Sequence, residues 1–157
     1  ERYKCENEPR LLISLAVKNF IHTFSHMMIE AFSYFSGYPS VNIKERIYLA
    51  DHDEGLGQEM TGILLYTTSS SSEGSLGGLV RLSESDKLDE IFKKGLSLSS
   101  WCSIDPLCIS SNPSSCHMCT HLTEVSCSHF NSSLDRAFLV PTLDDNFSPL
   151  IKEPDVE

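Results

Sequence analysis

The chain has 157 residues, 40% of them hydrophobic and 22% charged, a composition that excludes the disordered and fibrous classes of protein. This length suits one domain with its own hydrophobic core and is too short to divide comfortably into two. The formal net charge of -10 disfavours autonomous binding to nucleic acid, because affinity for phosphates comes mostly from Lys and Arg. Lys93 and Lys94 could form a local basic patch, although we favour a solvated helix face there.

The first residues, ERYKCENEPR, include no initiating Met and lack the layout of a signal peptide, so we expect a fragment of a longer protein. Polar or charged residues interrupt the longest apolar stretch: Lys18, Asn19, His22, His26 and Glu30. The sequence therefore predicts a soluble protein without a membrane-spanning helix.

Apolar residues recur at helical spacing between Pro9 and Phe35 and predict one long helix. One stripe of the helix comprises Leu12, Ala16, Phe20, Phe24, Met28, Phe32 and Phe35. Further apolar residues lie off that stripe: Leu15, Ile21, Met27 and Ile29. We therefore expect the helix to be buried nearly all round and to end at Gly37 and Pro39.

Two short segments rich in strand-forming residues follow, IKERIYLA at 43–50 and TGILLYTT at 61–68. They predict neighbouring strands joined by the acidic turn DHDEGLG. The next segment, SSSSEGSLGG at 69–78, has the composition of a loop.

A second helix is predicted to begin at Ser83, with Asp86 at the capping-box position, and to end near Gly95. The segment LDRAFLV at 134–140 predicts a short third helix, which Pro141 ends.

These elements predict an α+β (or α/β) fold in which a long buried helix packs on a small sheet. The single domain is expected to span residues 1–143 and to include a cysteine-rich lobe at 101–130. Residues 144–157 are expected to be an acidic, mobile tail.

The lobe is rich in Ser and Pro, has no hydrophobic periodicity, and holds five cysteines: Cys102, Cys108, Cys116, Cys119 and Cys127. The C-x-x-C knuckle at Cys116 and Cys119 can direct two thiolates to one tetrahedral zinc ion. Because metal binding can replace a missing hydrophobic core, we expect a structural zinc, one per chain.

A structural zinc needs four ligands, so one of the five cysteines is spare. Cys102 and Cys108 are predicted to complete the knuckle's site, with Cys127 as the reserve ligand. Cys5 is expected to be an unconnected thiol.

Three other interpretations of the cysteines stay open. Disulfides suit small secreted domains better than a chain with a core elsewhere. A redox pair at Cys116 and Cys119 would be expected to open a helix after a strand. Catalytic zinc would keep an open coordination position, and His117 and His121 lie close enough to take part.

His22 and His26 are four residues apart on the first predicted helix, and Glu30 lies one turn further on. This spacing suits a metal, but HTFSH lacks the Glu of an H-E-x-x-H motif. Hydrogen bonding in or beside the core is the commoner role of such histidines.

The glycine loop EGSLGGL lies between a strand and a helix, where backbone amides can bind phosphate. It lacks both the Lys-Ser or Lys-Thr pair and the G-x-G-x-x-G order of known nucleotide loops, so a tight turn is the simpler interpretation. No serine stands in the strand-turn-helix setting of a hydrolase nucleophile.

Taken in order, several segments resemble one known family over about residues 20 to 140. They are HTFSHMMIEAFSYFSGYPSVNIKERIY, GILLYTTSSSSEGSLGGLV, CSIDPLC, CHMCTHLTEVSC and NSSLDRAFLV. Together they resemble the C-terminal domain of the DrmB family of the DISARM antiphage system, which is related to the cysteine domain of MrfA-like DNA-repair helicases.

The resemblance implies a zinc site that matches Cys102, Cys108, Cys116 and Cys119, although Cys127 also belongs to the DrmB-type pattern. It also implies a cytoplasmic protein with reduced cysteines and a helicase partner similar to DrmA. DNA would then be contacted only within the complex.

We therefore predict a zinc-stabilised, non-catalytic scaffold or interaction domain that acts with a DNA helicase in antiphage defence. One alternative is a metal-dependent nuclease or hydrolase that uses His22, His26 and Glu30. Another is a DNA-contacting module whose acidic average conceals a basic groove.

Overall fold

A computed structural model describes residues 9–50, 60–67, 78–111, 114–141 and 148–151. Several predicted features lie outside these residues. They are Cys5, the acidic turn DHDEGLG, the glycine loop up to Gly77, and the tail apart from 148–151.

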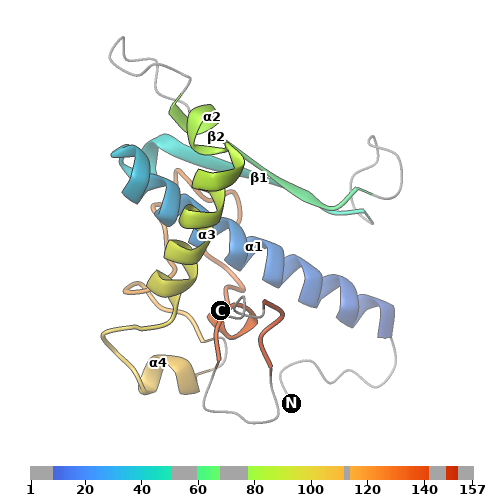
Figure 1. The fold of residues 1–157 in the computed structure, drawn as a ribbon. Helices are drawn as coiled ribbons and strands as arrows, with labels where there is room; N and C mark the ends of the chain where they lie inside the picture. The colour runs from blue at the N-terminus through green and yellow to red at the C-terminus, as the bar shows by residue number, and fades with distance from the viewer. Residues whose placement is uncertain (1–8, 51–59, 68–77, 112–113, 142–147, 152–157) are drawn as a thin grey trace.

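The long helix α1 (Pro9–Ser36) runs through the centre of the molecule (Figure 1). The strands β1 (Ile43–Tyr48) and β2 (Gly62–Thr67) pair antiparallel, with Ile43 opposite Thr67 and Tyr48 opposite Gly62. The other described elements are η1 (Ser40–Asn42), α2 (Gly78–Leu82), α3 (Ser85–Ser99), α4 (Leu107–Ser110) and η2 (Arg136–Phe138). No helix among the described residues is long and apolar enough to cross a membrane.

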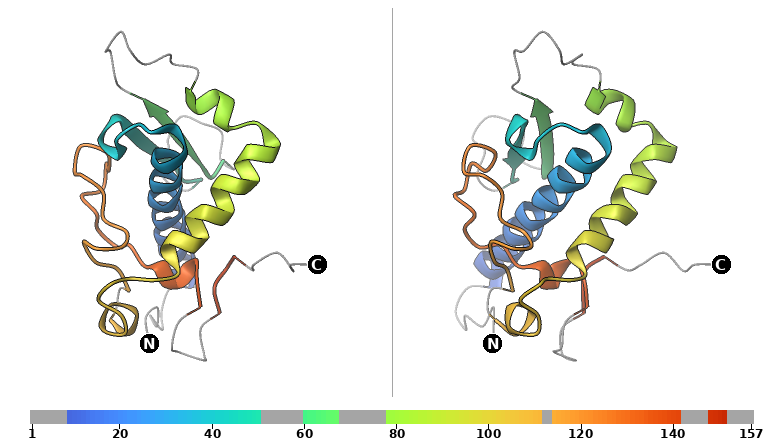
Figure 2. Two further views of the ribbon diagram at one scale, coloured as in Figure 1. Left: turned by 60° about the vertical axis from the view of Figure 1, so that its left-hand side comes forward. Right: turned by 90° about the vertical axis from the view of Figure 1, so that its left-hand side faces the viewer.

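The core forms where α1 packs between α3 on one side and the loops of the C-terminal third on the other (Figure 2). Its buried apolar residues are Met27, Met28, Ile29, Ala31, Phe32, Ile43, Ile91, Leu96, Leu122, Leu139 and Val140. This arrangement of helices and one small sheet, with a cysteine cluster towards the C-terminus, confirms the predicted α+β fold.

Burial along α1 differs from the prediction. Residues 22–29 are buried or partly buried on every face, because α3, β1 and the C-terminal loops surround this part of the helix. The N-terminal half is different, since Ile13 is 64% exposed and Leu15 is 43% exposed. The helix ends as predicted at Gly37, whose φ of 72° suits glycine and whose N–H bonds to Ser33 O.

The second predicted helix differs at both ends. It begins at Ser85 with Glu84 at the N-cap, so the predicted capping box is wrong; the Ser83 hydroxyl donates to Val80 O instead. It also continues through Gly95 to Ser99. Gly95 lies against Met27 on α1, so here glycine allows two helices to approach closely.

The third predicted helix shortens to the single 3-10 turn η2. Asp135 caps this turn, because its side chain accepts a hydrogen bond from Ala137 N. Leu134 and residues 136–140 are nevertheless buried. The apolar residues of this segment therefore pack in the core although most of the segment is not helical.

The cysteine-rich segment is not a separate appendage. Leu122 lies in the main core, and Ser126 O accepts the N–H of Glu45 on β1 at 3.3 Å. The Ser126 hydroxyl also donates to Ser40 O. Residues 120–127 therefore pack as a third layer against α1 and β1.

Candidate metal centres

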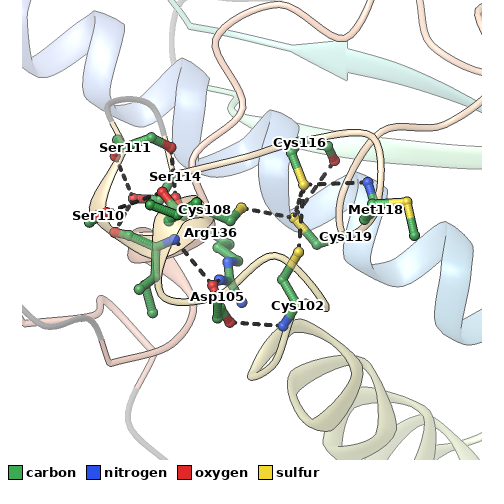
Figure 3. A network of polar contacts seen from close by, with 12 residues as sticks. Cys102, Asp105, Cys108, Ser110, Ser111, Ser114, Cys116, Met118, Cys119 and Arg136 are labelled. Atoms are coloured by element: carbon green, nitrogen blue, oxygen red, sulfur yellow. Dashed lines mark hydrogen bonds and ion pairs between the residues drawn. The ribbon is translucent and has the colours of Figure 1, made fainter.

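Four cysteine sulfurs converge beside the C-terminal end of α3 (Figure 3). The Sγ atoms of Cys102 and Cys116 are 3.5 Å apart, those of Cys108 and Cys119 3.7 Å, and those of Cys116 and Cys119 3.8 Å. All four thiols are free, and all four sulfurs lie within 4.8 Å of one another. A tetrahedral zinc with bonds of about 2.3 Å sets its sulfurs about 3.8 Å apart, so this four-thiol cluster fits a zinc ion.

Local backbone structure places each thiol. In the knuckle, the N–H groups of Cys119 and Thr120 both bond to Cys116 O, which forms a tight turn. The Met118 N–H points at Cys116 Sγ at 3.4 Å. Cys102 follows the end of α3, and Cys108 lies on the short helix α4.

Asp105 and Arg136 lie beside the four-thiol cluster and hold its backbone in place. The Asp105 carboxylate accepts the N–H groups of Cys102 and Ile109, at 2.9 Å and 3.2 Å. It also forms an ion pair with Arg136, whose side chain is fully buried and donates to Ser99 O. The charge of Arg136 also lies close to Cys108 and opposes, without cancelling, the rise in the pKa of that thiol.

Two of the four thiols, Cys108 and Cys119, resist ionisation in the absence of a metal. Burial and the neighbouring sulfurs raise the pKa of Cys108, and burial raises that of Cys119. For Cys116, burial opposes ionisation, but the Met118 N–H and the adjacent thiols lower its pKa. A divalent metal would supply the missing positive charge, since it binds thiolates directly.

A second cluster consists of His22, His26, Glu45 and Cys127, all buried. His22 Nε2 is 3.2 Å from Cys127 Sγ and 3.3 Å from Glu45 Oε1. His26 Nε2 is 3.6 Å from the same carboxylate oxygen. We call this set the histidine cluster.

The charges of the histidine cluster depend on one another. Burial favours a neutral Glu45, but the neighbouring rings of His22 and His26 lower its pKa to about 2. Burial likewise opposes ionisation of Cys127, whose pKa the histidines and two backbone N–H groups lower to about 6. Burial also opposes charge on His26, whose pKa rises to about 9 through Cys127 and Glu45.

The structure thus separates the five predicted ligands. It brings Cys102, Cys108, Cys116 and Cys119 together and places Cys127 in the histidine cluster. The sequence reasoning grouped Glu30 with the two histidines, and this grouping is wrong for the described residues, because Glu45 from β1 occupies that position.

Three neighbouring residues lie apart from both clusters. Glu30 borders a cavity of about 170 Å³ that Met118 also lines. His117 and His121 face each other, with their Nδ1 atoms 3.1 Å apart. Neither of these histidines belongs to the four-thiol cluster.

Sequence reasoning missed the roles of Glu45, Asp105 and Arg136. The signal for Glu45 was present, because alternation along β1 places it on the same buried face as Ile43. Asp105 and Arg136 belong to CSIDPLC and NSSLDRAFLV, two of the segments that carry the family resemblance. No spacing rule connects them, since they are 31 residues apart.

Residues 24–120 match the family model of the MrfA Zn-binding domain, and the chain belongs to this family. The matched range contains the whole four-thiol cluster.

The chain is also 44% identical over 140 residues to the DISARM protein DrmB of Bacillus paralicheniformis. That alignment covers 84% of this chain and 24% of the relative, so the chain spans about a quarter of the relative's length. The two comparisons confirm the resemblance inferred from the ordered motifs.

Proposed function

We propose that this chain is a zinc-stabilised, non-catalytic interaction domain of a multi-protein antiphage defence complex, in which it acts with a helicase subunit. The observation that carries the proposal is the four-thiol cluster, in which Cys102, Cys108, Cys116 and Cys119 converge at sulfur separations that suit one tetrahedral ion.

A zinc held by these four thiolates would have a closed coordination shell. Catalytic zinc sites keep one position for water or substrate, whereas structural sites fill all four with protein ligands. The surroundings also favour structure over chemistry, because Asp105 and Arg136 tie the cluster to the backbone beside it. The metal would join α4 and the knuckle to the end of α3.

The histidines of the alternative hydrolase are poorly placed for catalysis. His22 is 1% exposed and His26 is 0% exposed, so neither reaches a substrate from solvent. We therefore expect no nuclease, ATPase or peptidase turnover from this chain. Reproducible activity that His22→Ala or His26→Ala abolishes would overturn the non-catalytic assignment.

The biological context comes from the relative and from the resemblance of the motifs. A DISARM protein DrmB shares 44% identity with this chain, which supports a role in the same kind of defence complex. The resemblance to DrmB and to MrfA-like helicases supports a helicase partner, a cytoplasmic location, and contact with DNA only within the complex.

Co-purification of a DrmA-like helicase subunit with the full chain tests the proposed function. We expect the parent protein to retain the helicase and Cys119→Ser to lose one equivalent of zinc and most of the helicase. His121→Ala is the matched control, because His121 lies beside the knuckle but outside the four-thiol cluster. Retention of the helicase by zinc-depleted Cys119→Ser would contradict a zinc-dependent interaction surface.

A further inference from the structure

The histidine cluster gathers four potential metal ligands from three separate parts of the fold. His22 and His26 lie one turn apart on α1, Glu45 lies on β1, and Cys127 lies in the loop that packs against both. One ligand atom from each residue lies within 4.8 Å of the other three. The residues are 0–4% exposed, so the site is enclosed.

The hydrogen bonding of His26 leaves one ring nitrogen without a partner. Its Nδ1 lies 2.7 Å from Thr120 O, and a carbonyl oxygen only accepts, so Nδ1 carries a hydrogen. Nε2, which faces Glu45 Oε1, then carries a second proton in the metal-free chain or offers its lone pair to a metal ion. Neither His26 Nε2 nor Glu45 Oε1 has a hydrogen-bond partner, although both atoms are buried.

A buried ring nitrogen and carboxylate oxygen that face each other need a proton or a metal ion between them. We propose that His22, His26, Glu45 and Cys127 bind a second divalent transition-metal ion, zinc, in addition to the ion of the four-thiol cluster. Tetrahedral zinc sets nitrogen and oxygen ligands about 3.3 Å apart, and nitrogen and sulfur ligands about 3.5 Å apart. The observed N–S separation of 3.2 Å and the N–O separations of 3.3 and 3.6 Å lie within about 0.3 Å of these values.

The surroundings support metal ligation by these four residues. A metal-binding histidine usually donates its other ring N–H to a carbonyl or carboxylate, as His26 does to Thr120. Cys127 Sγ accepts the backbone N–H groups of His129 and Asn131, at 3.4 Å and 3.3 Å. The second carboxylate oxygen of Glu45 accepts the hydroxyl of Ser25.

The ligand types narrow the choice of metal. Magnesium and calcium prefer oxygen ligands, whereas imidazole combined with thiolate suits zinc and its neighbours in the first transition row. One carboxylate and one thiolate also balance the charge of a divalent ion, so the enclosed site would be neutral. Four protein ligands fill the shell, which assigns the ion a structural role between α1, β1 and the 120–127 loop.

A network without metal could hold the same four residues together. It would need protons on both imidazoles, which would then pair with the carboxylate and the thiolate. A divalent ion replaces these two protons with the same total charge, so a measurement of metal content must separate the two cases.

Metal content of the reduced 157-residue chain, expressed in zinc-supplemented medium, is the test. We expect two zinc ions per chain, although the knuckle alone predicts one. Cys127→Ser should remove one ion and leave the four-thiol cluster loaded, while Cys119→Ser should remove the other. His121→Ala should retain both ions.

One zinc in the parent chain, lost in Cys119→Ser but kept in Cys127→Ser, would overturn the second site and leave the proposed function intact. One zinc in the parent chain, lost in Cys127→Ser but kept in Cys119→Ser, would support the second site and contradict the proposed function. Expected results for the two sites can therefore be told apart.

A measurement on the parent protein covers the case in which Cys127→Ser does not fold. X-ray absorption at the zinc edge averages over all bound zinc. The two sites together give about 2.5 sulfur and about 1.5 nitrogen or oxygen neighbours per zinc. A first shell of four sulfurs alone would overturn the proposal.

Discussion

His26 on α1 is joined to Thr120 by a hydrogen bond of 2.7 Å, and Thr120 directly follows Cys119 of the four-thiol cluster. The chain therefore passes from the four-thiol cluster into the core between Cys119 and Thr120. The segment from Thr120 to Cys127 packs against α1 and β1, and its Leu122 is buried in the core. We therefore expect the part of the fold that depends on the four-thiol cluster to end near Cys119, earlier than the predicted lobe of 101–130.

We expect Cys119→Ser to loosen α4 and the knuckle without unfolding the core. The amide at position 119 should exchange faster than in the parent chain, because the turn that protects it is expected to depend on the metal. The amide of Leu122 should remain protected, since it donates to Asn131 Oδ1 at 2.9 Å in the core. Hydrogen exchange with mass spectrometry checks both segments.

His117→Ala is the control for this experiment, because His117 lies in the same knuckle and faces His121 rather than the thiols. It should leave the exchange pattern unchanged. Loss of protection throughout α1 in Cys119→Ser would mean that the four-thiol cluster is part of one cooperative core.

Gly95→Val should destabilise the chain by about 1–3 kcal/mol, because overpacking forces neighbouring groups to move. A Cβ atom at Gly95 would lie 3.0 Å from Met27 Cγ, and Val adds two methyl groups to it. Gly62→Val is the matched control, since nothing lies within 4 Å of a Cβ atom at Gly62. Urea unfolding of both variants measures the difference, and equal stability would contradict close packing of α1 on α3.

Sequence patterns predicted the elements that depend on local periodicity. The helical spacing of apolar residues gave α1 to within one residue at its C-terminal end, and β-rich segments gave both strands. Composition could not show that Gly95 faces Met27, so the end of α3 was placed too early. Packing against a distant helix decided that boundary.

The site was harder to predict because its residues come from distant segments. The C-x-x-C spacing identifies the knuckle, but nothing local distinguishes Cys108 from Cys127 as a third ligand. The contacts of Asn131 show how the loop determines which cluster Cys127 joins. It adopts a φ of 54°, bonds Leu122 N and O with its side chain, and directs its own N–H to Cys127 Sγ. This loop geometry turns Cys127 towards α1.

The isolated chain should bind duplex or single-stranded DNA weakly at physiological salt, because its net charge is -10. The two lysines of the possible basic patch do not alter this expectation. Lys94 Nζ lies 4.4 Å from the ring centroid of Tyr34, where a cation–π contact engages it. Fluorescence anisotropy is the measurement, and a dissociation constant below about 1 μM that weakens with salt would contradict the prediction.

Arg136→Ala should destabilise the chain by about 3 kcal/mol, because it leaves a largely buried carboxylate at Asp105 without its ionic partner. It also removes the donor to Ser99 O. Zinc affinity of the four-thiol cluster should fall about tenfold, since residues that position metal ligands typically contribute 10- to 100-fold. Urea unfolding measures the first effect, and competition with a chromophoric chelator measures the second.

Arg81→Ala is the matched control, because Arg81 is an exposed residue of α2. It should change stability by less than about 0.5 kcal/mol and leave zinc affinity unchanged. Arg136→Lys keeps the positive charge but loses the planar fork that reaches Asp105 and Ser99 together, so it should fall between the parent and Arg136→Ala. If Arg136→Ala matched Arg81→Ala in both measurements, Arg136 would not support the cluster, and charge balance at the thiols would have to come from the metal alone.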